Sequence, residues 1–466
     1  MQDKNMAAIE VLKTELPAEA WTTDKDIIAP FLVEWRDKYF GHTPIMLTPR
    51  NTQEVVQAVK ICAAQGLSIV PQGGNTGLVG GQTPMGEVLL SLRKMTTIRD
   101  ISVTNNAITV EAGAPLVTVQ NAADEVGLKF PLSLASEGSC TVGGVLSTNA
   151  GGVHVLKYGT TKELVFGVEA VLADGSIFNG LTTLRKDNTG YDLNRLFLGA
   201  EGTLGIITAA TLKLFPKPRF VQRVMCAVNS PKAALALLDM SGAGGALAMF
   251  EVMPKIGLDL VTTHMPDQRY PFEAPYDWFA LIDWEVESEE AGQDLATGLL
   301  ETAFEAAIIQ DAVIAQNETQ GLQLLNLREN MSEGQKYLGG SIKQDITVPI
   351  DRIPEFFERS DKAVEIIVPA CRPVGFGHFG DGNIHYNVGA PDGADKETFL
   401  SKWDDISRAV FDIVDDLGGS ISAEHGIGTM KKGDLVERAD PVKMTLLKSV
   451  KKALDPHGIM NPRVLV

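Results

Sequence analysis

The sequence predicts an α+β protein built from two domains, and three observations support this prediction. Its 466 residues are enough for two or more domains. Helix-like and strand-like segments interleave through the first half. At residues 216–218, Pro-Lys-Pro, glycine-rich loops give way to longer helices, which indicates a boundary. We therefore expect a first domain at 1–218, joined by the C-terminal tail 446–466, and a second domain at 219–445.

The first domain opens with a predicted helix followed by a buried strand. Asn51 can cap this helix, Glu54 occupies the capping-box position, and Gly66 ends it. Apolar residues spaced by one helical turn support the same helix. Apolar runs then predict strands that begin or lie at 67–70, 88–92, 107–111, 168–172 and 205–215.

The second domain has the pattern of an antiparallel sheet covered by helices. Strands are expected at 221–228, 278–285 and 344–348, and helices at 231–240, 291–309 and 316–338. The C-terminal tail predicts one more helix, which stops at Asp455-Pro456.

The composition is that of an ordinary globular protein, with 44% hydrophobic and 21% charged residues. A net charge of −18 argues against nucleic acid or an anionic membrane as partner. Charged residues within the first twenty argue against a signal peptide, and no apolar run is long enough for a transmembrane helix. The cysteines form no Cys-x-x-Cys pair and fit a reducing compartment, so we expect a cytoplasmic protein: Cys62, Cys140, Cys226 and Cys371.

Two histidines flank a turn in GHFGDGNIHYNV, residues 377–388. Asp381-Gly382 predicts a two-residue hairpin loop of type I′. With that loop, His378 lies directly opposite His385, with Cβ atoms roughly 5 Å apart, where two imidazoles suit a shared cation. The alternative is that one histidine is an exposed strand residue and the other packs in the core.

A third ligand is available in SAEHGIGTMKK, residues 422–432. Glu424 and His425 precede a Gly-x-Gly turn, and Gly426 can break a strand so that both side chains reach one site. Two histidines and a carboxylate form a common open metal site, whose remaining positions take water or substrate. The alternative is an unremarkable surface pair of Glu beside His.

Three glycine clusters lie in the first domain, at 71–81, 136–152 and 198–207. The first follows a strand, but GQTPMG comes next and cannot form the helix that a Rossmann fingerprint requires. No Gly-Lys-Ser/Thr sequence follows, so it is not a Walker A loop. Any one cluster alone favours an irregular loop. Together they predict backbone N–H groups around a large anionic cofactor.

In this order, these segments resemble the FAD-linked oxidoreductases of the vanillyl-alcohol-oxidase/PCMH type with an FAD-linked oxidase C-terminal domain. Within that family the chain is most similar to the D-2-hydroxyglutarate dehydrogenase branch of the D-2-hydroxyacid dehydrogenases, from about Pro44 to Pro462. Asn75 stands where some relatives attach FAD through a histidine, so the resemblance implies non-covalent FAD. The residues that it implies for FAD are Gln72, Gly73, Gly74, Asn75, Thr76, Gly77, Gly81, Gln82, Thr83, Ser136, Glu137, Gly138, Thr141, Gly143, Gly144, Asn149, Gly152, Gly205, Ile207 and Asn461.

The same resemblance implies a metal site and a catalytic base. The residues that match the family's divalent-metal ligands, usually for zinc, are His378, His385 and Glu424, and His425 matches its general base. The hairpin geometry expected from the sequence and the family resemblance thus lead to the same expectation, that the two histidines hold a metal.

The substrate expected from this branch is a 2-hydroxyacid with a second carboxylate. Arg328 has a planar fork that can grip the C1 carboxylate. Lys343, two residues before Asp345 on an expected strand, matches a lysine of the D-2-hydroxyglutarate branch, where D-lactate relatives tend to carry a small residue. Ser332 and Asn387 complete the expected set. We expect D-2-hydroxyglutarate, then D-malate, with D-lactate or glycolate as further alternatives.

Alternatives from other classes are a metal-dependent hydrolase, a non-redox flavoprotein resembling the ether-lipid synthases, and a flavin-binding partner without catalysis. The glycine-rich first half argues against the hydrolase. The family suggests an electron-transfer flavoprotein or a quinone as electron acceptor, and a homodimer is common within it.

Overall fold

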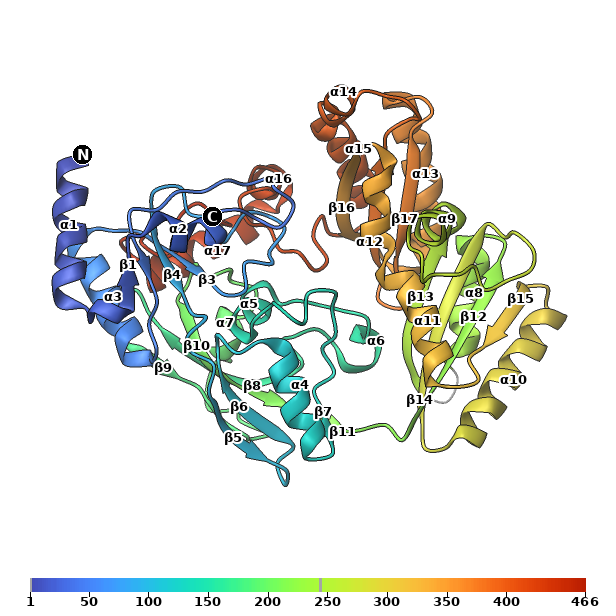
Figure 1. Ribbon diagram of the computed structural model, residues 1–466, viewed down its shortest axis with the longest axis horizontal. Coiled ribbons are helices and arrows are strands. Elements are labelled where there is room, and N and C mark those ends of the chain that lie inside the picture. The colour runs from blue at the N-terminus through green and yellow to red at the C-terminus, as the bar shows by residue number, and fades with distance from the viewer. Residues whose placement is uncertain (1, 243–244) are drawn as a thin grey trace. The chain divides into compact units, whose positions relative to one another are not determined.

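The computed structural model describes residues 2–242 and 245–466 of the chain (Figure 1). It divides into two compact units. The first unit comprises Met1–Gly152, Gly159–Lys217 and His425–Val466, and the second comprises Val153–Tyr158 and Pro218–Glu424. The chain enters the second unit at the Pro-Lys-Pro segment, and it returns to the first at His425, earlier than the expected tail at 446.

A short helix from the first half, α6 (Val155–Tyr158), belongs to the second unit. Its residues contact strand β14 (Trp278–Val286) of that unit. Nζ of Lys157 lies 2.7 Å from Oε2 of Glu285, and the hydroxyl of Tyr158 donates a hydrogen bond to the same carboxylate. Val153 and Leu156 also pack against the apolar clusters of the second unit, so the segment is joined to that unit by both polar and apolar contacts.

The first unit begins with helix α1 (Gln2–Glu15) and contains a four-stranded sheet in the order β1-β2-β4-β3. Its strands are β1 (Trp21–Thr22), β2 (Met46–Leu47), β3 (Ile69–Gln72) and β4 (Val88–Ser91). Helix α3 (Thr52–Gln65) leads into β3 as expected. The Asn51 side chain accepts a hydrogen bond from the Glu54 N–H at 3.0 Å, and Gly66 ends the helix with φ of 66°.

A five-stranded antiparallel sheet forms the rest of the first unit's core, in the order β5-β6-β10-β8-β9. Its strands are β5 (Ile98–Ser102), β6 (Ala107–Glu111), β8 (Val165–Val171), β9 (Ile177–Asn179) and β10 (Ile206–Lys213), and β7 (Leu128–Lys129) pairs separately with β11 (Phe215–Pro216). The helices include α2 (Lys25–Ile28), α4 (Leu116–Glu125), α5 (Val142–Thr148), α7 (Asn194–Phe197), α16 (Lys432–Arg438) and α17 (Pro441–Leu454). The last of these ends at Leu454 with Asp455 as its C-cap, in agreement with the expected stop at Asp455-Pro456.

The second unit is built on one seven-stranded sheet in the order β15-β12-β14-β13-β17-β18-β16. Its pairs are antiparallel, as expected. Besides β14, its strands are β12 (Phe220–Val228), β13 (Leu247–Pro254), β15 (Ile309–Ile314), β16 (Ser341–Thr347), β17 (Arg372–His378) and β18 (Asn383–Gly389).

Helices cover both faces of this sheet (Figure 1). On one face, alternate strand residues such as Phe250, Trp284 and Tyr386 pack with helices α8 (Pro231–Ser241), α10 (Glu289–Glu305), α13 (Ile353–Ile367) and α15 (Trp403–Asp416). On the other face, Met249 and Phe376 pack with α9 (Lys255–His264), α11 (Glu318–Glu329) and α12 (Met331–Gly334). The second face also carries the polar residues described below, because successive residues of a strand point to opposite faces.

Two helices of the second unit are shorter than expected. The helix predicted over 291–309 ends at Glu305, because Ala307 has φ of 54° and β15 begins at Ile309. The helix predicted over 316–338 divides at Asn330 into α11 and α12, followed by a 3₁₀ turn over Gln335–Leu338. No helix in the described part of the chain is long and apolar enough to cross a membrane.

Candidate active site

The two histidines lie on the β17–β18 hairpin, but the prediction that they face each other directly is wrong. Phe376 pairs with His385, and the strands are joined by residues 379–382. Of Asp381 and Gly382 only the glycine has a positive φ, 84°, whereas a type I′ turn needs two. His378 is therefore a diagonal neighbour of His385 on the same face, and the ring centroids lie 5.5 Å apart.

Glu424 lies between these histidines and faces each with one oxygen. Its Oε1 is 3.7 Å from Nε2 of His378, and its Oε2 is 3.8 Å from Nε2 of His385. Both distances are too long for hydrogen bonds. Ligand atoms about 2.0–2.2 Å from a tetrahedral zinc ion are roughly 3.3–3.6 Å from one another, close to these values. Each histidine therefore lies at a ligand-like distance from one oxygen of Glu424, but His378 is not among the side chains whose ligand atoms all lie within 4.8 Å of one another.

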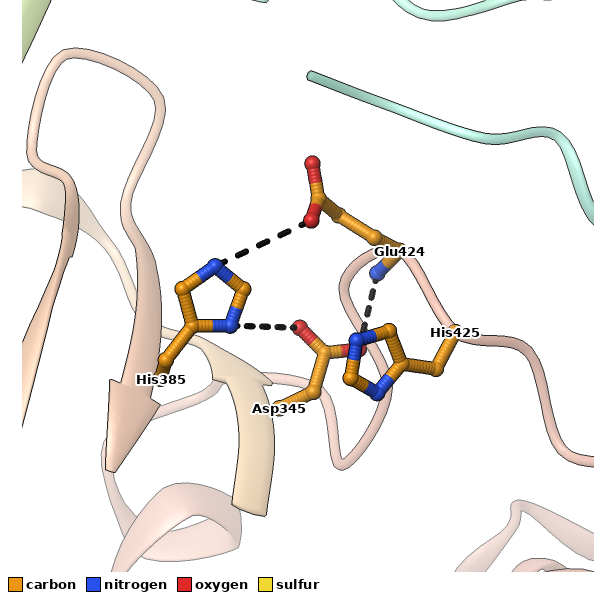
Figure 2. A group of neighbouring side chains, drawn as sticks. All are labelled: Asp345, His385, Glu424 and His425. Atoms are coloured by element: carbon orange, nitrogen blue, oxygen red, sulfur yellow. Dashed lines mark hydrogen bonds and ion pairs between the residues drawn. The ribbon is translucent and has the colours of Figure 1, made fainter. Parts of the chain in front are cut away.

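Asp345 holds this group from the neighbouring strand β16 (Figure 2). It pairs directly with His385, and its Oδ1 is 3.8 Å from Nδ1 of that histidine. Oδ1 also accepts a hydrogen bond from Nδ2 of Asn383 at 3.0 Å, and Oδ2 accepts one from the N–H of Glu424 at 2.9 Å. One buried carboxylate thus holds the backbone that carries Glu424 and lies beside the His385 ring.

His425 follows Glu424 in the chain and closes the group. One ligand atom from each of Asp345, His385, Glu424 and His425 lies within 4.8 Å of the others (Figure 2). His378 approaches this group through Glu424. The expected base is therefore held beside the expected metal ligands by chain continuity. Gly426, with φ of 81°, turns the chain immediately afterwards.

Behind His378, Glu251 joins the metal-site residues to Arg328. Glu251 on β13 is fully buried and pairs across the sheet with His378. One of its oxygens shares a hydrogen bond with Nδ1 of His378, and the other accepts one from Nε of Arg328 at 2.5 Å. The guanidinium carbon of Arg328 lies 4.8 Å from the centre of the Phe376 ring.

The charges in this group shift one another's protonation. Burial disfavours ionisation of Glu251, but Arg328 and His378 hold its pKa at about 2. Burial disfavours the charged form of His378, yet Glu251 raises its pKa to about 9. Burial also raises the pKa of Glu424 to about 7, with Asp345 adding to the rise and His378 opposing it. Such shifts are typical of functional sites.

The other residues expected to bind substrate lie on the same part of the second unit. Lys343 on β16 pairs directly with Asn387 on β18 and shares the face of Asp345. Asn387 donates a hydrogen bond from Nδ2 to Oε1 of Gln335 at 2.9 Å. Ser332, on α12, is exposed.

In the first unit, the loops expected to bind FAD pack against one another. A Cβ on Gly73 would lie 2.1 Å from Oγ1 of Thr141, and a Cβ on Gly74 would lie 2.1 Å from the carbonyl oxygen of Ser139. Asn461 joins them from the C-terminal tail, where its Nδ2 donates to the carbonyl of Gly81 at 3.0 Å. Only glycine allows these backbones to approach so closely.

Four buried side-chain oxygens of this set have no hydrogen-bond partner within the described residues: Gln72 Oε1, Thr83 Oγ1, Thr141 Oγ1 and Asn461 Oδ1. Such groups are costly unless a ligand or water satisfies them. The tight loops and these acceptors fit a large cofactor that is bound through backbone and hydroxyl groups. Asn75 has φ of 59° and donates to the carbonyl of Val33 at 2.9 Å, so its side chain serves the loop's own structure.

The expected FAD residues are distributed over five places in the first unit. Gln72 ends β3, and the loop after it carries Gly73, Gly74, Asn75, Thr76, Gly77, Gly81, Gln82 and Thr83. The turn before α5 carries Ser136, Glu137 and Gly138, and Thr141 occupies the N-cap position of that helix without a side-chain capping bond. Within or after α5 lie Gly143, Gly144, Asn149 and Gly152, next to or on β10 lie Gly205 and Ile207, and the tail carries Asn461.

Glu201 anchors the segment after His425 to the same unit. Its Oε1 accepts the N–H of Ile427 at 2.8 Å, and its Oε2 accepts the N–H of Gly428 at 2.7 Å. Burial raises the pKa of Glu201 to about 7, although these two bonds and Lys431 oppose the rise.

Sequence reasoning missed Glu201 and Glu251. Glu201 lies within the third glycine cluster, where the glycines are the stronger sequence signal. Glu251 is a single charge in the apolar strand LAMFEVMP. A charged residue within a buried strand is the one signal that could have identified it, because such charges are rarely buried without a partner.

Comparisons with known proteins agree with these two units. The family of FAD binding domains matches residues 43–180, and the C-terminal domain of FAD linked oxidases matches residues 217–465. The mitochondrial D-2-hydroxyglutarate dehydrogenase of Arabidopsis thaliana is 35% identical, over 94% of this chain and 78% of that protein. A putative mitochondrial D-lactate dehydrogenase of Schizosaccharomyces pombe is 36% identical, over 95% of this chain and 85% of that protein.

Among solved structures, p-cresol methylhydroxylase is similar with a TM-score of 0.79 and 17% identity, covering 99% of this chain and 97% of the other. At that identity the similarity concerns the fold alone, and it confirms the expected PCMH type. The two matched domains and the relatives at 35% and 36% identity show the family as well. The chain therefore belongs to the FAD-linked oxidase family and is an FAD-dependent dehydrogenase.

Proposed function

We propose that this dehydrogenase oxidises D-2-hydroxyglutarate to 2-oxoglutarate, with D-malate as the nearest alternative substrate. The observation that carries the proposal is the grouping of Arg328 and Lys343 with the histidine–glutamate cluster in the second unit. Two cations suit a substrate with two carboxylates, because each can form a charge-assisted hydrogen bond. A relative at 35% identity that is named for this substrate supports the choice.

The residues described above fit FAD and a divalent cation, for which we propose zinc. Held non-covalently by the glycine loops, FAD supplies the acceptor for the hydride that leaves C2. Held by His378, His385 and Glu424, a divalent cation supplies a Lewis acid that lowers the pKa of the substrate hydroxyl.

The chain's own residues bind the substrate and move its proton. Arg328 uses Nε for Glu251, which leaves its two terminal nitrogens to hold the C1 carboxylate. Lys343 holds the distal carboxylate, and Asn387 and Ser332 donate to the remaining substrate oxygens. His425 takes the hydroxyl proton as a general base, a role that typically contributes ~10²–10⁴-fold in rate. The C2 hydrogen then leaves with both electrons, and C2 becomes a carbonyl carbon.

An anaerobic titration tests this proposal. The yellow protein as purified is mixed with D-2-hydroxyglutarate, D-malate or D-lactate, with and without chelator, and bleaching of the flavin is followed. We expect the dicarboxylates to bleach the flavin at the lowest concentrations, and chelator to slow the reaction. Bleaching by lactate alone would retain the dehydrogenase and discard the substrate, and rates unaffected by complete metal removal would discard the metal.

Two variants test the proposed roles. His425→Asn should keep FAD and metal but lose 10²–10⁴-fold in the rate of flavin reduction. Arg328→Ala should raise KM for every 2-hydroxyacid, because all of them carry the C1 carboxylate. Near-normal flavin reduction by His425→Asn would remove the base from the mechanism.

A second candidate is D-lactate or glycolate dehydrogenation, supported by the relative named a putative D-lactate dehydrogenase. The titration above separates it from the first candidate. Because the chain is an FAD-dependent dehydrogenase, two functions considered from the sequence are no longer candidates: a metal-dependent hydrolase and a flavin-binding partner without catalysis.

The proposal also includes an electron acceptor, either an electron-transfer flavoprotein or a quinone. Stopped-flow reoxidation of the reduced enzyme with each acceptor distinguishes the two. A homodimer is the expected assembly, which sedimentation of the purified protein measures.

A further inference from the structure

Glu251 forms hydrogen bonds with both a candidate metal-site histidine and the proposed substrate arginine. It lies in the middle of β13, and it is fully buried. One oxygen faces Nδ1 of His378, 127 residues further along the chain, and the other faces Nε of Arg328, 77 residues away. These contacts lie within the second unit.

The chemistry of this position favours a carboxylate over any neutral side chain. An ionised carboxylate offers acceptors on both oxygens, whereas an amide offers one acceptor and one donor group. Here both partners are donors, because Arg has no acceptor, and the Nδ1 of His378 must carry the proton that it shares with an ionised carboxylate. The fully buried carboxylate therefore offers one acceptor oxygen to each neighbour.

Each contact has a consequence for the site. With Nδ1 bonded to Glu251, His378 turns its other ring nitrogen, Nε2, toward Glu424, 3.7 Å away. With its Nε occupied and its guanidinium carbon 4.8 Å from the centre of the Phe376 ring, Arg328 keeps its fork in one orientation. Carboxylates that orient metal-binding histidines are a common feature of metal sites.

We propose that Glu251 is a positioning residue that orients the metal ligand His378 and the substrate-binding Arg328 with a single carboxylate. This inference rests on the proposed function, since it concerns how that site holds its metal and its substrate. It links the two halves of the site: a change at Glu251 weakens metal binding and substrate binding together.

A matched control is available one strand away on the same face of the sheet. Asp283 on β14 is also buried, and it accepts hydrogen bonds from Arg223, with Nε to Oδ1 at 2.6 Å. It contacts no histidine among the described residues. Glu251→Gln and Asp283→Asn therefore both neutralise a buried carboxylate paired with arginine, but only the first removes an acceptor from His378.

The experiment measures two quantities on the FAD-loaded protein. Kd for Zn²⁺ is determined by competition with a chromophoric chelator after metal removal, and KM and kcat are measured with D-2-hydroxyglutarate. For Glu251→Gln we expect Zn²⁺ binding to weaken 10–100-fold, the usual effect of removing such a partner. We also expect KM to rise at least fivefold. Asp283→Asn should stay within twofold of the wild type in both quantities.

Two results would overturn the inference. One is Zn²⁺ affinity within twofold of the wild type in Glu251→Gln. The other is an equal loss in Asp283→Asn, which would indicate a general effect of a buried amide on the fold. If Glu251→Gln does not fold, Glu251→Asp serves instead, because its shorter side chain keeps the charge but cannot reach both partners. It should still bind Zn²⁺ at least fivefold more weakly than Asp283→Asn, and affinity equal to that control overturns the inference.

The wild-type protein separates this inference from the proposed function. If the wild type binds Zn²⁺ but no 2-hydroxyacid bleaches its flavin, the proposed function fails, while the comparison of Kd values still decides the role of Glu251 at the metal. If the wild type is reduced by D-2-hydroxyglutarate and Glu251→Gln equals the wild type, only the inference fails.

Discussion

Asp345 lies directly opposite His385 in the β16–β18 pair and accepts the backbone N–H of Glu424 at 2.9 Å. Its other oxygen accepts a hydrogen bond from Asn383 at 3.0 Å. One strand residue therefore fixes both the segment that carries Glu424 and the hairpin that carries His385. These hydrogen bonds to a sheet residue therefore hold Glu424 next to His385 in the candidate metal site.

We predict that Asp345→Asn weakens Zn²⁺ binding 10–100-fold while FAD content is unchanged. An asparagine has one acceptor oxygen, so it must present its amide N–H groups to a donor, either Asn383 or the Glu424 N–H. Metal content after dialysis and flavin absorbance measure the two effects. Asp361→Asn is the control, because Asp361 receives one donor, the Tyr386 hydroxyl at 2.6 Å, which an amide oxygen can also accept. Equal metal loss in both variants would contradict the prediction.

We predict that Lys343→Ala changes substrate preference. Loss of a hydrogen bond to a charged group costs about 1.5–3 kcal/mol, which corresponds to roughly 10–150-fold in KM for D-2-hydroxyglutarate and D-malate. KM for D-lactate should change less than threefold, because lactate has no second carboxylate. Lys362→Ala is the control, since Lys362 lies on α13 and pairs with Glu358 at 2.7 Å. Equal losses on lactate and hydroxyglutarate would remove Lys343 from the specificity.

The sequence was most informative where the candidate sites consist of short, contiguous motifs. The three glycine clusters, the histidine hairpin and the Glu424-His425 pair each lie within a few residues, so their residue types and order could be recognised. The α3 helix was predictable for the same reason, because its cap at Asn51 and its stop at Gly66 are local.

Features that depend on distant partners were not predictable. The role of Glu251 comes from residues 77 and 127 positions away, and nothing near it in LAMFEVMP indicates them. The predicted register of the histidine hairpin was wrong, because a type I′ turn needs positive φ at both Asp381 and Gly382, and only Gly382 has it. The predicted end of α10 was wrong, because Ala307 adopts a positive φ that its helix propensity does not indicate.

We predict that Gly74→Ala abolishes FAD binding. The added Cβ would lie 2.1 Å from the carbonyl oxygen of Ser139 and 2.9 Å from Cα of Cys140, and backbone atoms cannot give way cheaply. The two glycine loops would separate, and the protein should purify with less than a tenth of the wild-type flavin absorbance. Gly433→Ala is the control, because a Cβ there meets nothing within 4 Å and lies in α16, where alanine favours the helix. Wild-type flavin content in Gly74→Ala would show that these loops tolerate separation.

The last prediction concerns the pH dependence of stability in the first unit. Burial raises the pKa of Glu201 to about 7 from an ordinary value of 4.5. Between these two pH values the folded state binds more protons than the unfolded state, so stability falls as pH rises. The stabilisation is fully present below pH 4.5 and lost by about pH 7, and the shift corresponds to about 3 kcal/mol.

Glu201→Gln removes this titration, so the comparison with the wild type isolates it. Flavin release during denaturation is followed for both proteins between pH 4.5 and pH 8. The amide loses one acceptor for the N–H groups of Ile427 and Gly428, which lowers stability equally at every pH. The difference in stability between wild type and variant should therefore shrink steadily as pH rises.

Glu87→Gln is the control. Burial alone would raise the pKa of Glu87, but hydrogen bonds from Met85 and Arg463 outweigh burial and lower it. Glu87 therefore titrates only in more acid solution, and the difference in stability between wild type and Glu87→Gln should stay constant over this range. A difference for Glu201→Gln that is constant or grows with pH would show that this carboxylate does not titrate in the folded protein as its burial requires.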